Sequence, residues 1–213
     1  MTAARERVAA QRAKEAKSAR RRSIIIGSAA AIVAGGVIAG LAAVVMTSDG
    51  GGGGSTTATV TVASNVASPI QGVTAYTAQS THVGGDVTYQ QVPPVGGQHN
   101  QVWQNCGIYD KPVPNKHAVH SLEHGAIWIT YNPTLPADQL DKLKAKAKQD
   151  YMLLSPYAGM STPITVTSWG MQLKVDNADD PRIDQFITQY RNNKQTTPEY
   201  GAACTGGTGK PTS

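Results

Sequence analysis

Six residues decide the fold: Ala126-Ile-Trp-Ile-Thr-Tyr131, which lie between Gly125 and Pro133. Their aromatic and β-branched side chains predict a β-strand. A helix is predicted directly afterwards, from Pro136 to Tyr151, because apolar residues recur there at helical spacing and lysines occupy the other face. A strand followed at once by an amphipathic helix indicates a domain that contains both.

The same order repeats downstream. Residues 163–170 (PITVTSWG) predict a second strand that continues toward 172–175. Asp180 with Pro181 predicts the cap and first position of a last helix, whose predicted buried face consists of Ile183, Phe186, Ile187 and Tyr190. Upstream, residues 81–100 contain two Gly-Gly pairs and a Pro-Pro, which favour loops. We therefore predict an α+β domain over 79–204, with a small mixed sheet, two packed helices and a loop-rich N-terminal half.

An uncharged stretch, Ser23 to Met46, precedes this domain. As a helix its residues would rise about 36 Å, enough to cross a hydrocarbon core of roughly 30 Å. The apolar run is longer than the roughly 7–15 residues of a cleavable signal peptide, so we predict a retained transmembrane helix over 23–46. Residues 47–78, which include five consecutive glycines, are predicted to be a flexible linker, and 205–213 a disordered tail.

The positive charge of the chain lies in its N-terminal tail. Eight basic and two acidic side chains give residues 1–22 a charge of +6, so the other residues together carry −1 of the total of +5. A basic segment at the edge of a span stays in the cytoplasm. We therefore predict a single-pass plasma-membrane protein with an extracytoplasmic domain, and no nucleic-acid partner.

Cys106 and Cys204 are the two cysteines of the chain. In an oxidising compartment they are expected to form a disulfide, although two free thiols are the alternative. The bridge would close a long loop and stabilise the domain by ~4–5 kcal/mol in the chain-entropy model.

All five histidines fall between residues 82 and 124. His120 and His124 are four apart and so share a face of a helix or a strand, and a flexible turn could bring His99 to them. Clustered imidazoles favour a transition metal, copper or zinc. His99, His120 and His124 are the predicted ligands, with His82 and Met160 as further candidates. Glu123 could itself ligate the ion or serve as a base, and we predict that it orients one of the ligand imidazoles by a hydrogen bond.

Two other interpretations remain open. The histidines could stabilise loops by hydrogen bonds in a structural interaction module without metal. Alternatively, His120-Ser-Leu-Glu-His124 matches H-x-x-E-H, the motif of inverted zinc peptidases, with Glu199 as a distant carboxylate. The strand that follows Gly125 argues against a helix there, and Pro198 argues against a helical Glu199, so we do not favour an enzyme.

Several motifs in order resemble the DUF3105 family: Pro93-Pro-Val-Gly-Gly-Gln-His99, Trp103-Gln-Asn-Cys-Gly-Ile-Tyr109, 118–131 and Ser168-Trp-Gly-Met-Gln-Leu173. The resemblance extends over roughly 80–204 and implies an actinobacterial membrane-anchored protein with a basic tail, one span and an external domain. It also implies a histidine at 82, 99, 120 and 124 and a glutamate at 123, but not a histidine at 117. The family has no assigned activity. We hypothesise that the domain handles metal or serves as an accessory subunit of an envelope or respiratory membrane complex.

Overall fold

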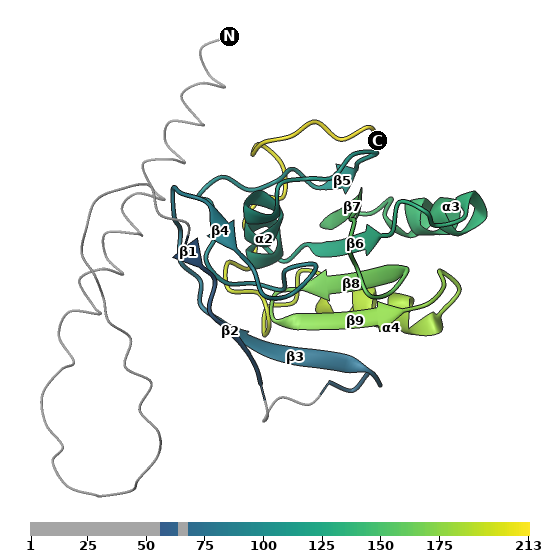
Figure 1. Ribbon diagram of the computed structural model, residues 1–213, viewed down its shortest axis with the longest axis horizontal. Helices are drawn as coiled ribbons and strands as arrows, with labels where there is room; N and C mark the ends of the chain where they lie inside the picture. The colour runs from purple at the N-terminus through teal and green to yellow at the C-terminus, as the bar shows by residue number, and fades with distance from the viewer. Residues whose placement is uncertain (1–55, 64–67) are drawn as a thin grey trace, which may run out of the picture. The chain divides into compact units, whose positions relative to one another are not determined.

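The computed structural model describes residues 56–63 and 68–213 (Figure 1). A seven-stranded mixed sheet has the order β2-β3-β9-β8-β6-β7-β5, with β2 (Val60–Val62) and β3 (Val73–Ala78) at one edge and β5 (Gly107–Ile108) at the other. At its centre lie β6 (Ile127–Tyr131), β7 (Met152–Pro156), β8 (Ile164–Ser168) and β9 (Met171–Val175). Strand β6 is parallel to β7 and antiparallel to β8. The predicted α+β class with a mixed sheet is confirmed.

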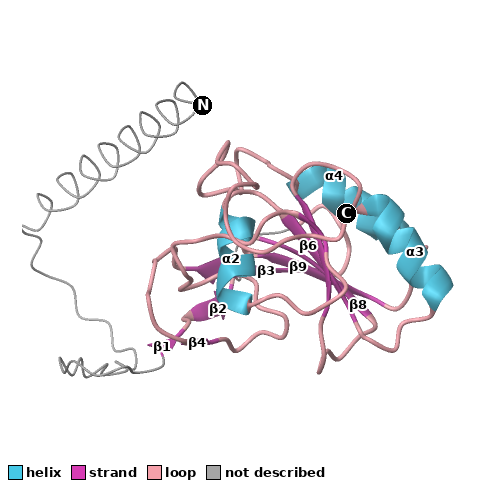
Figure 2. Cartoon of the chain, turned by 90° about the horizontal axis from the view of Figure 1, so that it is seen from above, coloured by secondary structure: helices cyan, strands magenta, loops and turns pink. Residues whose placement is uncertain are grey.

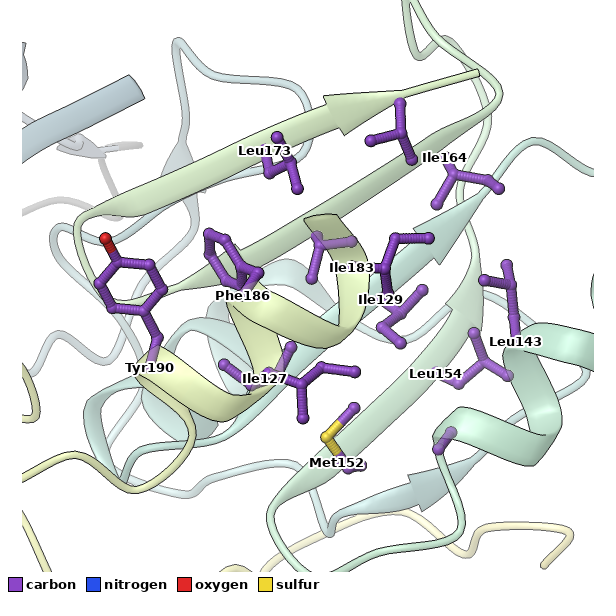
Figure 3. Close-up of a cluster of buried hydrophobic side chains, with 14 of the residues drawn as sticks. Ile127, Ile129, Leu143, Met152, Leu154, Ile164, Leu173, Ile183, Phe186 and Tyr190 are labelled. Atoms are coloured by element: carbon purple, nitrogen blue, oxygen red, sulfur yellow. The ribbon is translucent and has the colours of Figure 1, made fainter. Parts of the chain in front are cut away.

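Two helices, α3 (Ala137–Lys146) and α4 (Pro181–Tyr190), pack on one face of the sheet. Figure 3 shows Ile183, Phe186 and Tyr190 of α4 directed toward the side chains of the strands. The carboxylate of Asp180 accepts a hydrogen bond of 2.9 Å from the backbone N–H of Arg182, and Pro181 occupies the first turn. The predicted cap and buried face of this helix are therefore confirmed.

A third helix, α2 (Asn115–Glu123), covers the opposite face (Figure 2). Its Ala118 and Leu122 pack with Trp128 of β6 and Leu153 of β7 in a second, smaller core. The sequence predicted two packed helices and argued against one before Gly125, and the structure corrects both statements. The apolar face of α2 is short but completely buried, and this burial stabilises the helix.

The folded part begins earlier than the predicted boundary at residue 79. Within the predicted linker 47–78 lie β1 (Thr56–Thr57), β2 (Val60–Val62) and β3 (Val73–Ala78). Strand β3 pairs with β9 and so belongs to the main sheet. Residues 47–55 and 64–67 of that segment lie outside the described residues.

The region between β3 and α2 is rich in loops, as predicted. Its strands are β4 (Val87–Thr88), which pairs with β1, and β5 (Gly107–Ile108), which pairs with β7. The helix predicted from Pro136 to Tyr151 is shorter than expected, because α3 ends at Lys146. Tyr151 has a positive φ of 59° and leads directly into β7, a strand that the sequence did not predict.

The C-terminal segment is ordered against the domain, contrary to the predicted disordered tail over 205–213. Thr208 forms a β-bridge with Gln104, and the backbone N–H of Ile108 donates a hydrogen bond of 2.8 Å to the carbonyl of Ser213. A disulfide joins Cys106 to Cys204, with their Cα atoms 5.4 Å apart, as the sequence predicted.

No helix among residues 56–63 and 68–213 is long and apolar enough to cross a membrane. The predicted span over 23–46 and the basic tail over 1–22 lie outside the described residues.

Candidate metal centre

Helix α2 presents two of the candidate histidines on one face. His120 lies in its last turn and His124 is its C-cap, whose backbone N–H donates to the carbonyl of His120 at 3.1 Å. Gly125 follows with φ of 100°, which ends the helix and turns the chain into β6. A Cβ atom at Gly125 would lie 2.9 Å from the Cα atom of Asn192, so the turn also needs glycine for space. Because His120 and His124 are four residues apart at the end of α2, the centroids of their imidazole rings are 4.5 Å apart.

A pair of loops brings two further histidines to this face. His82 and His99 form a parallel β-bridge, and the backbone N–H of Val83 donates to the carbonyl of His99 at 2.7 Å. The loop before His99 is fixed to the main sheet because the carbonyl of Val95 accepts a hydrogen bond of 2.9 Å from Gly170. Residues far apart in the sequence therefore meet beside α2.

Four side chains form what we name the first ligand group: His82, His99, His120 and Glu123. Their ligand atoms all lie within 4.8 Å of one another. The Oε2 atom of Glu123 lies 3.4 Å, 2.7 Å and 3.8 Å from the Nε2 atoms of His82, His99 and His120. The hydroxyl of Ser80 donates to the other carboxylate oxygen of Glu123. These atoms converge closely enough to share one ion.

Three side chains form what we name the second ligand group: His120, His124 and Glu199. The Oε2 atom of Glu199 lies 3.3 Å from Nε2 of His124. The backbone N–H of Glu199 donates a hydrogen bond of 3.0 Å to the carbonyl of Glu123, which fixes the C-terminal segment to the end of α2. The two groups share His120.

Three of the imidazoles are oriented in the same way. The Nδ1 atoms of His99, His120 and His124 each lie 2.7 Å from a backbone carbonyl, of Gly97, Asn100 and Ala203 respectively. Since a carbonyl oxygen can only accept, each Nδ1 carries the hydrogen. Metal-binding histidines in proteins are oriented by such bonds, which leave Nε2 to face the ion.

Burial and neighbouring charges shape the ionisation of the cluster. Burial, followed by repulsion from His124, lowers the pKa of His120 to about 3, so its Nε2 lone pair is free at neutral pH. A hydrogen bond from His124 lowers the pKa of Glu199, whose carboxylate is therefore ionised. A neutral imidazole and an anionic carboxylate are the forms that bind metal ions.

The cluster is closed in its middle and open at two ends. The side chains of His99, His120 and Glu123 are at most 3% exposed, whereas His82 is 43% and Glu199 39% exposed. The indole of Trp103 packs against His120 and His124, and Trp169 packs edge-on against His99. These rings limit the access of water to the middle of the cluster.

The structure separates the predicted ligands. It brings His99 and His120 together with His82, but places His124 in the second ligand group. Glu123, expected behind the ligands, faces three of the imidazoles directly. Met160 lines a cavity with Asn132 and Asp176 beyond the carboxyl end of β7. His124 lies at the opposite end of the strands, because it precedes the amino end of β6, which is parallel to β7. Met160 is therefore not a ligand of this cluster.

Glu199 is the functional candidate that sequence reasoning set aside. The H-x-x-E-H interpretation includes it as a distant carboxylate, although Pro198 argues against a helix at this position. The structure shows that no helix is required, since hydrogen bonds and the nearby disulfide hold the segment against α2. His117 lies outside both groups, and its Nδ1 atom contacts the carbonyl of Val102.

Comparison with known proteins gives one family match. The family described as "Protein of unknown function (DUF3105)" matches residues 81–206, which include all six side chains of the two ligand groups. Neither a curated protein nor a solved structure matches the chain.

Proposed function

Because the chain belongs to the DUF3105 family, whose description names no activity, we propose from the site itself that this domain binds one transition-metal ion in the first ligand group. One observation carries the proposal. Backbone carbonyls hold the buried imidazoles of His99 and His120 by Nδ1, so that their Nε2 atoms converge with the carboxylate of Glu123. This convergence of ligand atoms supports a metal site, because ligand histidines are oriented by such bonds to Nδ1.

The donor atoms favour zinc. The first ligand group offers three imidazole nitrogens and one carboxylate oxygen, a set that suits tetrahedral Zn²⁺ and also accepts Cu²⁺. Among residues 56–63 and 68–213, no sulfur ligand of the kind that selects Cu⁺ joins this group: both cysteines form the disulfide, Met160 lies elsewhere, and Met152 and Met171 are in the main core. We therefore propose Zn²⁺ as the natural ion, with Cu²⁺ as the competing one.

The proposed setting is the outer face of the plasma membrane. The uncharged stretch 23–46 and the basic residues before it support a single span with the N-terminus in the cytoplasm. The disulfide supports an oxidising compartment for the domain. In this setting the domain would handle metal in the envelope or serve as an accessory subunit of a membrane complex.

Metal titration of the full-length chain in detergent tests the proposal. The metal-free chain is expected to bind one Zn²⁺ and to unfold at a higher temperature, by a margin equivalent to about 2.7 kcal/mol at a hundredfold excess over the dissociation constant. His120→Gln should abolish this shift, and His117→Gln, on the same helix but outside both groups, should keep it. If the chain binds neither Zn²⁺ nor Cu²⁺, the cluster is structural and the domain is an interaction module without metal.

A second candidate function, hydrolysis, is favoured by α2 itself. The segment His120–His124 lies on a helix, and Glu199 approaches the second histidine, as the H-x-x-E-H motif requires. In that chemistry Glu123 would activate a water bound to zinc in the second ligand group. The test is turnover of peptide and ester substrates by the zinc-loaded chain. Glu123→Gln should abolish turnover while zinc stays bound to the second ligand group.

A further inference from the structure

The cluster contains more ligands than one ion uses. Six side chains of the two groups converge, whereas a zinc ion in a protein takes four ligands. The two groups overlap in one residue, His120, and each contains one carboxylate, Glu123 in the first and Glu199 in the second. A single zinc site therefore does not account for all six side chains.

His120 can serve only one ion at a time. Its Nδ1 atom carries the hydrogen that is donated to the carbonyl of Asn100 at 2.7 Å, so Nε2 is its single available ligand atom. Two ions, one in each group, would compete for that atom. Occupation of the complete first group therefore excludes occupation of the complete second group.

We propose that the two groups are alternative positions of one ion, which passes between them while it stays bound to His120; this rests on the proposed function. The step is short, because the imidazole centroid of His120 lies 4.7 Å from that of His82, 4.9 Å from that of His99 and 4.5 Å from that of His124. The ion loses His82, His99 and Glu123 and gains His124, Glu199 and one water. The step is ligand exchange without a change of oxidation state.

The two positions differ in their coordination. The first has four protein ligands and is closed, as in structural zinc sites, whereas the second has three and leaves one place for water or an incoming ligand, as in reactive sites. The positions differ in the number of protein ligands and not in exposure, because each group has one exposed end, His82 at 43% and Glu199 at 39%. Solvent reaches the first group at His82 and the second at Glu199, and the shared His120 is only 3% exposed. Because one of its places is open, the second position is where an ion can be handed to a ligand from outside.

The experiment disables each group separately in the full-length chain. The first-group variant carries His82→Ala and His99→Gln, and the second-group variant carries His124→Gln and Glu199→Gln. The variant His120→Gln affects both groups, and His117→Gln is the matched control. Zinc affinity is measured by competition with a chromophoric chelator, the number of ions by native mass spectrometry, and the ligands by X-ray absorption. Thermal unfolding of each metal-free variant shows that it is folded.

The expected result is one ion per chain in the wild type and in both double variants. The second-group variant should keep three imidazoles around zinc, and the first-group variant should show two imidazoles and additional oxygen from water. The first-group variant should bind more weakly than the wild type by at least 10–100-fold, roughly the cost of losing a single outer-shell partner. His120→Gln should weaken binding further than either double variant, and His117→Gln should bind as the wild type does.

Three outcomes would overturn the proposal. If the first-group variant is folded but binds no zinc, the second group is not a metal position. If the wild type binds two ions tightly, His120 is not shared between exclusive positions. If the wild type binds no metal at all, the proposed function itself fails, which the first two outcomes leave intact.

Discussion

The carboxylate of Glu123 lies 2.7 Å from the Nε2 atom of His99, and both side chains are at most 1% exposed. The opposite ring nitrogen of His99 already donates to the carbonyl of Gly97. A contact this short between Nε2 and a carboxylate oxygen needs a hydrogen or a metal ion between the two atoms. In the metal-free chain it is a hydrogen, so the metal must displace it.

Zinc binding is therefore expected to release about one proton from this contact, because ligands lose their protons to the metal. The release is measured by calorimetric titration of the full-length chain in buffers of different ionisation enthalpy. Glu123→Gln should release less than the wild type, and His117→Gln should release the same amount. Equal release from the wild type and Glu123→Gln would show that the ion does not enter between these two side chains.

The stability of the metal-free chain is expected to fall in acid because of His120. Its pKa is lowered to about 3 in the folded chain, whereas an unfolded histidine titrates near 6.5. Between these values the unfolded chain binds the extra proton, so the free energy of unfolding decreases as the pH falls from about 6.5 toward 3. The loss should be on the order of a few kcal/mol. Glu199 acts in the same direction below its unfolded pKa, because its folded pKa is lowered.

Urea unfolding of the metal-free chain at several pH values measures this dependence. The slope between pH 6.5 and 4.5 should be smaller in His120→Gln than in His117→Gln, because the first variant lacks the titrating group. An identical slope in the two variants would show that another group is responsible for the acid sensitivity.

Helix α4 shows what local sequence can determine. Asp180 as cap, Pro181 in the first turn and apolar residues at helical spacing all lie within the element, and all were identified from the sequence. Strand β7 shows the opposite case. Its residues Met152-Leu-Leu-Ser-Pro156 come directly after a helical pattern and include good helix formers. The positive φ of Tyr151 and the pairing with β6 on one side and β5 on the other determine the strand.

The candidate site was likewise predictable from the sequence only in part. The density of histidines and the pair His120/His124 are visible in the sequence, and they identified the region. The assignment of His99 and His124 to different groups depends on the His82/His99 bridge and on the segment that carries Glu199. Both result from contacts between distant parts of the chain, which spacing alone does not encode. Strand β3 was missed for a related reason, because its Thr- and Ala-containing sequence gains stability from β9.

Loss of the disulfide should weaken the second ligand group more than the first. Ala203, whose carbonyl orients His124, is adjacent to Cys204, and the backbone N–H of Cys106 donates to the carbonyl of Cys204 at 2.7 Å. The double variant Cys106→Ser/Cys204→Ser should lose about 2–5 kcal/mol of stability. Zinc affinity should fall further when these changes are added to the first-group variant than when they are added to the second-group variant. Equal losses in the two backgrounds would show that the disulfide does not position Glu199 and His124.

The turn at Gly125 is expected to couple the metal centre to the sheet. Gly125→Ala places a Cβ atom 2.9 Å from the Cα atom of Asn192 at a φ of 100°, whereas Gly159→Ala, at a φ of 78°, meets nothing within 4 Å. Both variants bear the cost of a positive φ, about 1–3 kcal/mol, but only the first must also move backbone. Gly125→Ala should therefore lower the urea midpoint more than Gly159→Ala.

Zinc affinity distinguishes a local effect of Gly125→Ala from a general loss of stability. His124 immediately precedes this turn, and the backbone N–H of Asn192 donates to the carbonyl of Gly125 at 2.8 Å. A shift of the turn therefore moves the end of α2 that carries the imidazole of His124. Gly125→Ala should weaken zinc binding at temperatures where the variant is still folded, and Gly159→Ala should not. Unchanged affinity in a destabilised Gly125→Ala chain would mean that the turn supports the fold without positioning the ligands.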